Sequence, residues 1–131
     1  MRHPQILVFE PDSRLAALLR PLAEERRWAL REPRQLGPCL GLLRQGGPGV
    51  LVIRLGRDLE REFGLLERVT WLSPATGRVV VGDADQTWLA GLAWDLGADF
   101  VLLPPLGRER LAEVVAGLMP GQAMRGSAGE S

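Results

Sequence analysis

Cysteine and histidine are nearly missing from this chain of 131 residues, which holds one of each, Cys39 and His3. A single cysteine excludes an internal disulfide, and this cysteine usage gives no sign of an oxidising compartment. One cysteine and one histidine are also too few for a zinc cluster made of these residues. We therefore expect no disulfide-stabilised fold and no metal centre of the Cys/His kind.

Long apolar runs and net charge are missing as well. The apolar run at 6–9 is too short for the core of a signal peptide, and no window approaches the roughly 18 apolar residues of a membrane span. The 16 basic and 16 acidic residues cancel, so no long-range attraction to nucleic acid or to an anionic membrane is expected. These absences predict a cytoplasmic protein that binds neither nucleic acid nor membrane.

What the chain does have is enough apolar sequence for a proper core. Hydrophobic residues make up 46 % of it and charged residues 24 %, which excludes global disorder. The length predicts a single domain over 1–119. The last segment, 120–131, is small, polar and rich in glycine, so we expect a flexible tail there.

Apolar runs of strand length alternate with segments of helical periodicity. Strong strand candidates lie at 6–9, 50–53, 79–81 and 100–103, and a weaker edge-strand candidate lies at 28–32. Helices are predicted after Asp12 or Ser13, either of which can cap the first one, and over 38–43, 58–69, about 85–96 and about 107–118. Right-handed crossovers then give a flavodoxin-like, doubly wound (βα)5 fold, an α/β fold with a five-stranded parallel sheet in the order 2-1-3-4-5.

Two stretches carry a resemblance to a known family. In "DLGADFVLLPPL" (95–106), Gly97 and Ala98 are followed by an apolar run and Pro104-Pro105. In "ILVFEPDSRLAALLR" (6–20), an apolar strand ends in Glu10, Pro11 and Asp12 before a leucine-rich helix. Over 4–119 the chain resembles the CheY-like receiver domains of response regulators in bacterial two-component signalling.

The resemblance implies a phosphorylation pocket from which key groups have gone. The phosphate-accepting aspartate of receivers falls at Arg54, their threonine or serine at Gly82 and their lysine at Pro104, while Val101 stands where an aromatic residue is usual. Pro11 replaces one of the acids that help to bind Mg²⁺. We therefore expect a degenerate pseudo-receiver that is neither phosphorylated nor an enzyme, and that uses no metal or cofactor. The residues of its degenerate phosphorylation pocket are Glu10, Pro11, Asp12, Arg54, Gly82, Asp83 and Pro104.

The role of Arg54 has two readings. Paired with Glu10, it would put a fixed cation where a receiver holds metal and phosphate, and so lock the pocket. Alternatively, its guanidinium extends into solvent. Asp58 and Asp83 are expected to cap a helix and to shape a turn, and whether Pro104-Pro105 is cis stays open.

Because the chain is not expected to be phosphorylated, we expect its function to lie in contacts with other proteins. Trp88 and Trp94 on the fourth helix, with Val101 and Ala112, predict an interface formed by helix four, strand five and helix five, to another protein or a second copy. The alternative for these tryptophans is packing against their own domain. Trp28 and Trp71 are expected to pack in or over the core.

Two other functions stay open beside this interaction module. One is an atypical response regulator that is phosphorylated on a displaced aspartate, and the other is a flavodoxin-like domain that binds a small ligand. No GxGxxG, Walker motif or Ser/His/Asp set supports an enzyme.

Overall fold

The computed structural model describes residues 4–46, 49–56, 58–104 and 107–120. It contains a sheet of five parallel strands, in the order β2-β1-β3-β4-β5. The strands are β1 (Gln5–Phe9), β2 (Ala29–Arg31), β3 (Gly49–Arg54), β4 (Gly77–Val81) and β5 (Phe100–Leu102). This order confirms the flavodoxin-like fold predicted from the sequence. The tail at 121–131 and the Pro104-Pro105 bond lie outside the described residues.

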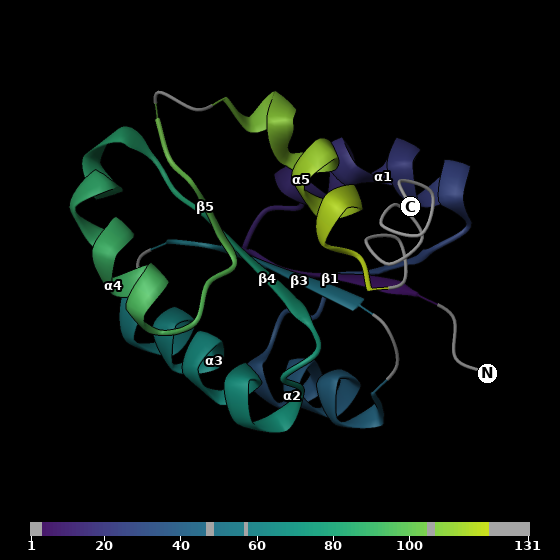
Figure 1. The fold of residues 1–131 in the computed structure, drawn as a ribbon, viewed down its shortest axis with the longest axis horizontal. Coiled ribbons are helices and arrows are strands. Elements are labelled where there is room, and N and C mark those ends of the chain that lie inside the picture. Colours follow the sequence, from purple (N-terminus) through teal and green to yellow (C-terminus); the bar gives the residue numbers. More distant parts are fainter. Residues whose placement is uncertain (1–3, 47–48, 57, 105–106, 121–131) are drawn as a thin grey trace, which may run out of the picture.

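Helices cover both faces of the sheet (Figure 1). Helices α1 (Arg14–Arg26) and α5 (Leu111–Leu118) lie on one face, and α2 (Leu36–Gln45), α3 (Leu59–Leu72) and α4 (Ala90–Asp95) on the other. Short 3-10 turns, η1 (Ala84–Leu89) and η2 (Arg108–Arg110), lead into α4 and α5. Among the described residues, no helix is long and apolar enough to cross a bilayer.

The core is two clusters, one on each side of the sheet. Successive side chains of a strand point to opposite faces, so Ile6 and Val8 pack with α1 and α5, while Leu7 and Phe9 pack with α2 and α3. Val101 belongs to the second of these clusters and is 7 % exposed. Its predicted place at an interface is therefore wrong, because strand alternation turns it into the core beneath α4.

The exposure of two other predicted core residues also differs from expectation. Trp28 is buried as predicted, but Trp71, at the end of α3, is 82 % exposed. In the helix predicted over about 85–96, α-helical spacing puts Leu92 on an inward stripe with Leu89, Ala93 and Leu96, but Leu92 is 45 % exposed. The chain enters α4 through a 3-10 turn, which has fewer residues per turn than an α-helix, so the predicted α-helical stripe loses its phase there.

Candidate functional site

A cleft of about 880 Å³ opens at the carboxyl ends of β1, β3 and β4, the edge at which open α/β sheets bind ligands. Five residues of the predicted pocket line it: Glu10, Pro11, Asp12, Arg54 and Asp83. Its other described lining residues are Phe9, Arg34, Gln35, Leu55, Gly56, Asp58, Arg61, Glu62, Asp85 and Gln86. Gly82 and Pro104 lie outside this lining. The structure thus brings together most of the predicted pocket, though not all of it.

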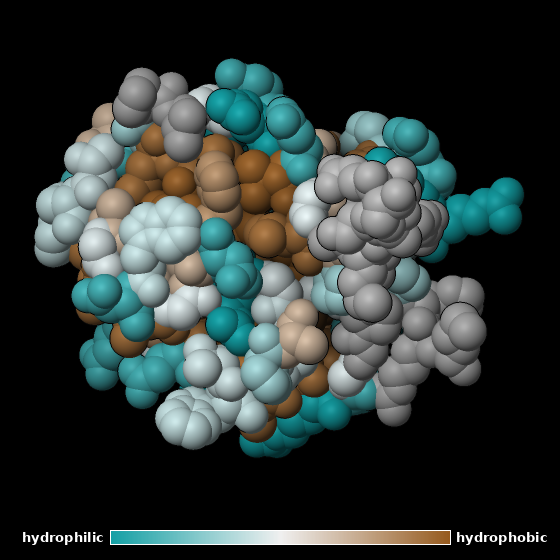
Figure 2. Space-filling model, in the orientation of Figure 1, coloured by the Kyte–Doolittle hydropathy of each residue, from teal (hydrophilic) through white to brown (hydrophobic). Residues whose placement is uncertain are grey.

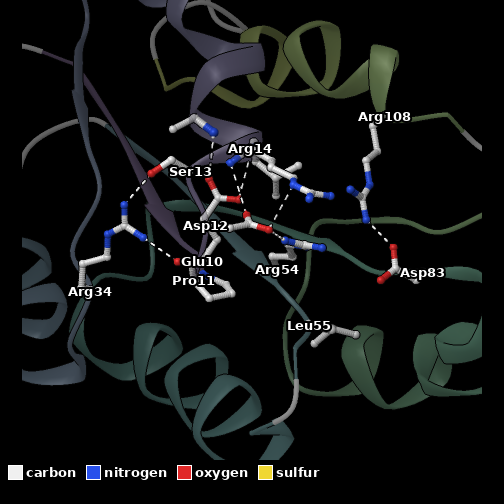
Figure 3. Close-up of polar contacts among 12 residues, drawn as sticks. Glu10, Pro11, Asp12, Ser13, Arg14, Arg34, Arg54, Leu55, Asp83 and Arg108 are labelled. Atoms are coloured by element: carbon white, nitrogen blue, oxygen red, sulfur yellow. Dashed lines mark hydrogen bonds and ion pairs between the residues drawn. The ribbon is translucent and has the colours of Figure 1, made fainter.

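Arg54 is paired, and its partner is Asp12. Its Nη1 donates to Asp12 Oδ2 at 2.5 Å, and its side chain is only 15 % exposed (Figure 3). The hydrogen bond from Arg54 lowers the pKa of Asp12 and raises the pKa of Arg54 itself. The pairing with Glu10 that the sequence suggested is therefore wrong, and so is the alternative of a fully solvated guanidinium.

Glu10 is engaged elsewhere because it caps helix α1. Its Oε1 and Oε2 accept the backbone N–H groups of Leu15 at 3.0 Å and Ala16 at 2.9 Å, and the residue is 6 % exposed. The first N–H groups of a helix lack internal partners and attract negative charge, so a buried carboxylate is stable there. Of the two predicted caps, Ser13 makes no side-chain cap bond and has a left-handed backbone, with φ 62°, whereas Asp12 Oδ1 accepts the N–H of Arg14 at 3.3 Å.

Arg34 pins the same loop from the opposite side. Its Nη1 donates to the Pro11 carbonyl at 2.7 Å, and its Nη2 donates to Ser13 Oγ at 2.5 Å (Figure 3). Both contacts span more than 20 residues, and no local sequence pattern reveals them. The loop after β1 is consequently tied by Glu10, Arg34 and Arg54 at once.

The loop after β4 is tied as well. Asp83 forms an ion pair with Arg108 of η2, and its N–H donates to Gln86 Oε1 at 2.8 Å. Asp58 accepts the N–H of Arg61 at 3.1 Å, which confirms its predicted role as a cap, here of α3.

A third set of contacts, which the sequence did not predict, holds the loop after β3. Glu62 is 5 % exposed, and its Oε1 accepts the Gly56 N–H at 2.7 Å. Gln86 Nε2 donates to the Leu55 carbonyl at 3.2 Å. Burial raises the pKa of Glu62. The cleft floor is thus built from side chains that bind neighbouring backbone.

These contacts do not fit the magnesium ion that the receiver resemblance implies. Mg²⁺ prefers an octahedron of oxygen ligands, including one or two carboxylates. Both oxygens of Glu10 are held by helix N–H groups, Asp12 is held by Arg54, and Pro11 has no ligating side chain. Within the described part of the chain, no group of three or more His, Cys, Asp or Glu residues is arranged to hold a metal ion.

The structure separates the four predicted interface residues. Trp88 is 73 % exposed and Trp94 is 49 % exposed, whereas Ala112 is half-buried and packs against the cluster below α1 and α5. Trp88 Nε1 donates to the Asp85 carbonyl at 3.1 Å, and the Trp94 ring meets the Phe100 ring edge-on at 6.5 Å. With Val101 buried, the two tryptophans are the members of this set whose large side chains are exposed to solvent.

Comparison with known proteins gives a likeness of fold. No protein-family model and no curated protein matches the sequence. A signal receiver domain of an HD domain-containing protein from Pseudomonas fluorescens Pf-5 superposes with a TM-score of 0.74 at 20 % identity, over 97 % of this chain and 94 % of that one.

Two further solved structures cover nearly all of the chain. The CheY-like response regulator receiver domain protein from Methanospirillum hungatei JF-1 gives a TM-score of 0.73 at 17 % identity, over 95 % of this chain and 99 % of that one. An adenylate cyclase structure from Rhodopirellula baltica gives 0.74 at 14 % identity, over 99 % and 96 %. The protein described here thus has the fold of response-regulator receiver domains.

Proposed function

We propose that this chain is a degenerate receiver that is not phosphorylated and acts, as a cytoplasmic non-enzymatic module, by binding protein partners. The observation that carries the proposal is Arg54, which ends β3 where a receiver has its phosphate-accepting aspartate and is ion-paired with Asp12 at 2.5 Å. A guanidinium stays protonated at all physiological pH values, so it cannot attack a phosphoryl group.

The groups that would assist phosphoryl transfer are missing too. Such transfer depends on a positioned nucleophile and on cations that offset charge on the moving oxygens. The position of the receiver lysine holds Pro104, and the whole sequence contains no lysine. Gly82 offers no hydroxyl, and a Cβ there would lie 2.5 Å from Leu103 Cδ2, so a serine or threonine would have to displace that side chain.

The other acids of the cleft are poor substitutes for the missing aspartate. Asp83 is held by Arg108, and Asp58 caps α3. A displaced phosphoacceptor would have to give up these contacts and would still lack a lysine and a hydroxyl beside it. These contacts argue against the atypical regulator. The small-ligand alternative has the cleft itself in its favour, but the charged groups named above bind one another across it.

The proposed partner surface is the face formed by α4, β5 and α5. Hydrophobic residues gather on this side of the molecule, mainly over β5 and the adjoining side of α5 (Figure 2). Trp88 and Trp94 add exposed aromatic area, and tryptophan is enriched at the centres of protein interfaces. Either another protein or a second copy of the chain would cover such a face, with no nucleic acid or membrane involved.

Incubation with acetyl phosphate and Mg²⁺, followed by intact mass measurement, tests the proposal. An ordinary receiver domain treated in parallel shows that the reagent is active. We expect no phosphoryl mass on the wild type, and no rise in its unfolding midpoint with Mg²⁺. Arg54→Asp is the matched variant: it supplies the carboxylate alone, and we expect it to stay unphosphorylated for want of lysine and hydroxyl. Phosphorylation of the wild type on any aspartate would overturn the proposal.

A further inference from the structure

The segment from β4 to β5, residues 83–99, has an unusual charge. It holds four aspartates, Asp83, Asp85, Asp95 and Asp99, and no basic residue, although the chain as a whole is neutral. Two of the four are used internally: Asp83 pairs with Arg108, and Asp99 Oδ2 accepts the Arg78 N–H at 2.8 Å. Asp85 and Asp95 are exposed, and their carboxylates contact no hydrogen-bond donor or cation among the described residues.

These two free carboxylates flank an exposed apolar pair. Trp88 follows Asp85 by three residues in the 3-10 turn η1, Leu92 follows Trp88 by four, and Asp95 follows Leu92 by three. Such spacings place side chains on one side of a helix. Trp88 is 73 % exposed and Leu92 is 45 % exposed. We call this row, Asp85, Trp88, Leu92 and Asp95, the α4 stripe.

Trp88 is already oriented for binding. Its indole Nε1 donates to the Asp85 carbonyl at 3.1 Å, which restrains the ring while leaving most of it in solvent. When a partner covers the ring, Trp88 therefore loses little further side-chain entropy. An exposed indole face also attracts cations, and arginine in particular. The stripe therefore has an apolar centre, two acidic ends and one cation-attracting ring.

We infer that the α4 stripe binds a basic amphipathic helix of a partner protein, with an apolar centre and an arginine or lysine toward each end. The inference rests on the proposed function, because it gives the chemistry of the partner for part of the proposed face. Counting about 2.0 Å per residue in η1 and 1.5 Å in α4, Asp85 and Asp95 lie about 17 Å apart, which is roughly three turns of a partner helix. The matching basic residues should therefore stand about three turns apart.

Charge also disfavours a second copy as the occupant. Two α4 stripes packed antiparallel about a twofold axis would place Asp85 of one copy near Asp95 of the other. Unpaired like charges at an interface oppose association, whereas a basic segment neutralises both ends. The stripe thus discriminates by repulsion against copies of itself as well as by attraction to its partner.

A designed peptide probes this chemistry directly. The probe is a fluorescein-labelled, alanine-rich helix with two or three leucines on one side and an arginine toward each end, about three turns apart. The matched peptide has glutamate for each arginine. Fluorescence anisotropy of each peptide with the full chain gives Kd at low and at moderate salt. We expect saturable binding of the arginine peptide only, weakening as salt rises.

Four variants locate the binding. Trp88→Ala should raise Kd about tenfold or more, as loss of an interface anchor does. The double variant Asp85→Asn, Asp95→Asn should raise it about fivefold and flatten the salt dependence. Trp71→Ala removes another exposed tryptophan, from the end of α3, and the double variant Glu60→Gln, Glu67→Gln removes two exposed acids from α3. Both should leave Kd within about twofold.

Several results would overturn the inference. Equal binding of the glutamate peptide, absence of saturable binding by the arginine peptide, or an equal loss in the α3 variants would each do so. Sedimentation of the chain alone is the last arm: a dimer that Trp88→Ala dissociates would identify a second copy as the occupant. The phosphorylation assay is independent of all of these results, so failure of the docking inference and failure of the proposed function are distinguishable.

Discussion

Replacing Glu10 with alanine tests whether this residue is a structural cap or a free metal ligand. The carboxylate is 6 % exposed and accepts two helix N–H groups, at 3.0 and 2.9 Å. Hydrogen bonds to a charged group contribute about 1.5–3 kcal/mol each, and loss of a helix cap costs about 1 kcal/mol. The substitution also removes a buried charge that is costly to desolvate, which offsets part of the loss.

The expected net effect of Glu10→Ala is therefore a loss of about 2–3 kcal/mol in the free energy of unfolding. Urea unfolding followed by far-UV circular dichroism measures it, with an unchanged slope showing that the two-state comparison holds. Glu25→Ala removes an exposed carboxylate from the same helix and should change stability by no more than about 0.5 kcal/mol. Glu10→Gln keeps one acceptor oxygen and should fall between the two.

A small effect would refute this reasoning. If Glu10→Ala costs no more than Glu25→Ala, the two N–H contacts contribute nothing, and the carboxylate is free to bind a cation. If instead Mg²⁺ raises the stability of the wild type but not of Glu10→Ala, Glu10 acts as a metal ligand. Either result would remove one support of the degenerate-pocket proposal.

Four further predictions follow from individual residues. Burial raises the pKa of Glu62 above 4.5, so the folded state binds the Glu62 proton more tightly than the unfolded state does. The free energy of unfolding should therefore rise as pH falls through the folded-state pKa and level off below 4.5. Glu62→Gln should abolish that rise in urea unfolding measured across this pH range. The lowered pKa of Asp12 acts in the opposite direction at lower pH, with stability lost as pH falls below 3.8, and Asp12→Asn separates the two effects. Gly82→Ala should lower the free energy of unfolding by about 1–3 kcal/mol, because its Cβ would meet Leu103 Cδ2 at 2.5 Å and Gln86 Oε1 at 2.9 Å. Thermal or urea unfolding measures this, and a loss below about 0.5 kcal/mol would show that the two side chains move aside freely. Cys39 is fully buried, and burial raises its pKa to about 12, so a thiol reagent should label it only after unfolding; rapid labelling of the native protein would contradict its placement.

The strands and their order were predictable because their signals are local. Runs such as 50–53 are apolar throughout, as strands covered on both faces must be, and alternation with helices leaves few parallel topologies. Exposure on helices was less predictable. Leu92 and Trp71 turned outward because helix phase depends on how each helix begins and on what packs beside it.

The candidate site, like the fold, was predictable from the sequence only in part. The amino-acid sequence by itself determined which groups are missing: no lysine anywhere, and Arg54, Gly82 and Pro104 at positions where receiver chemistry needs other side chains. Only the tertiary structure decided how the remaining charges pair. Both oxygens of Glu10 accept N–H groups of α1, and the guanidinium of Arg54 pairs with Asp12. Contacts such as that of Arg34 with Pro11 join residues far apart in sequence, so they depend on where packing brings the loops and not on any local pattern.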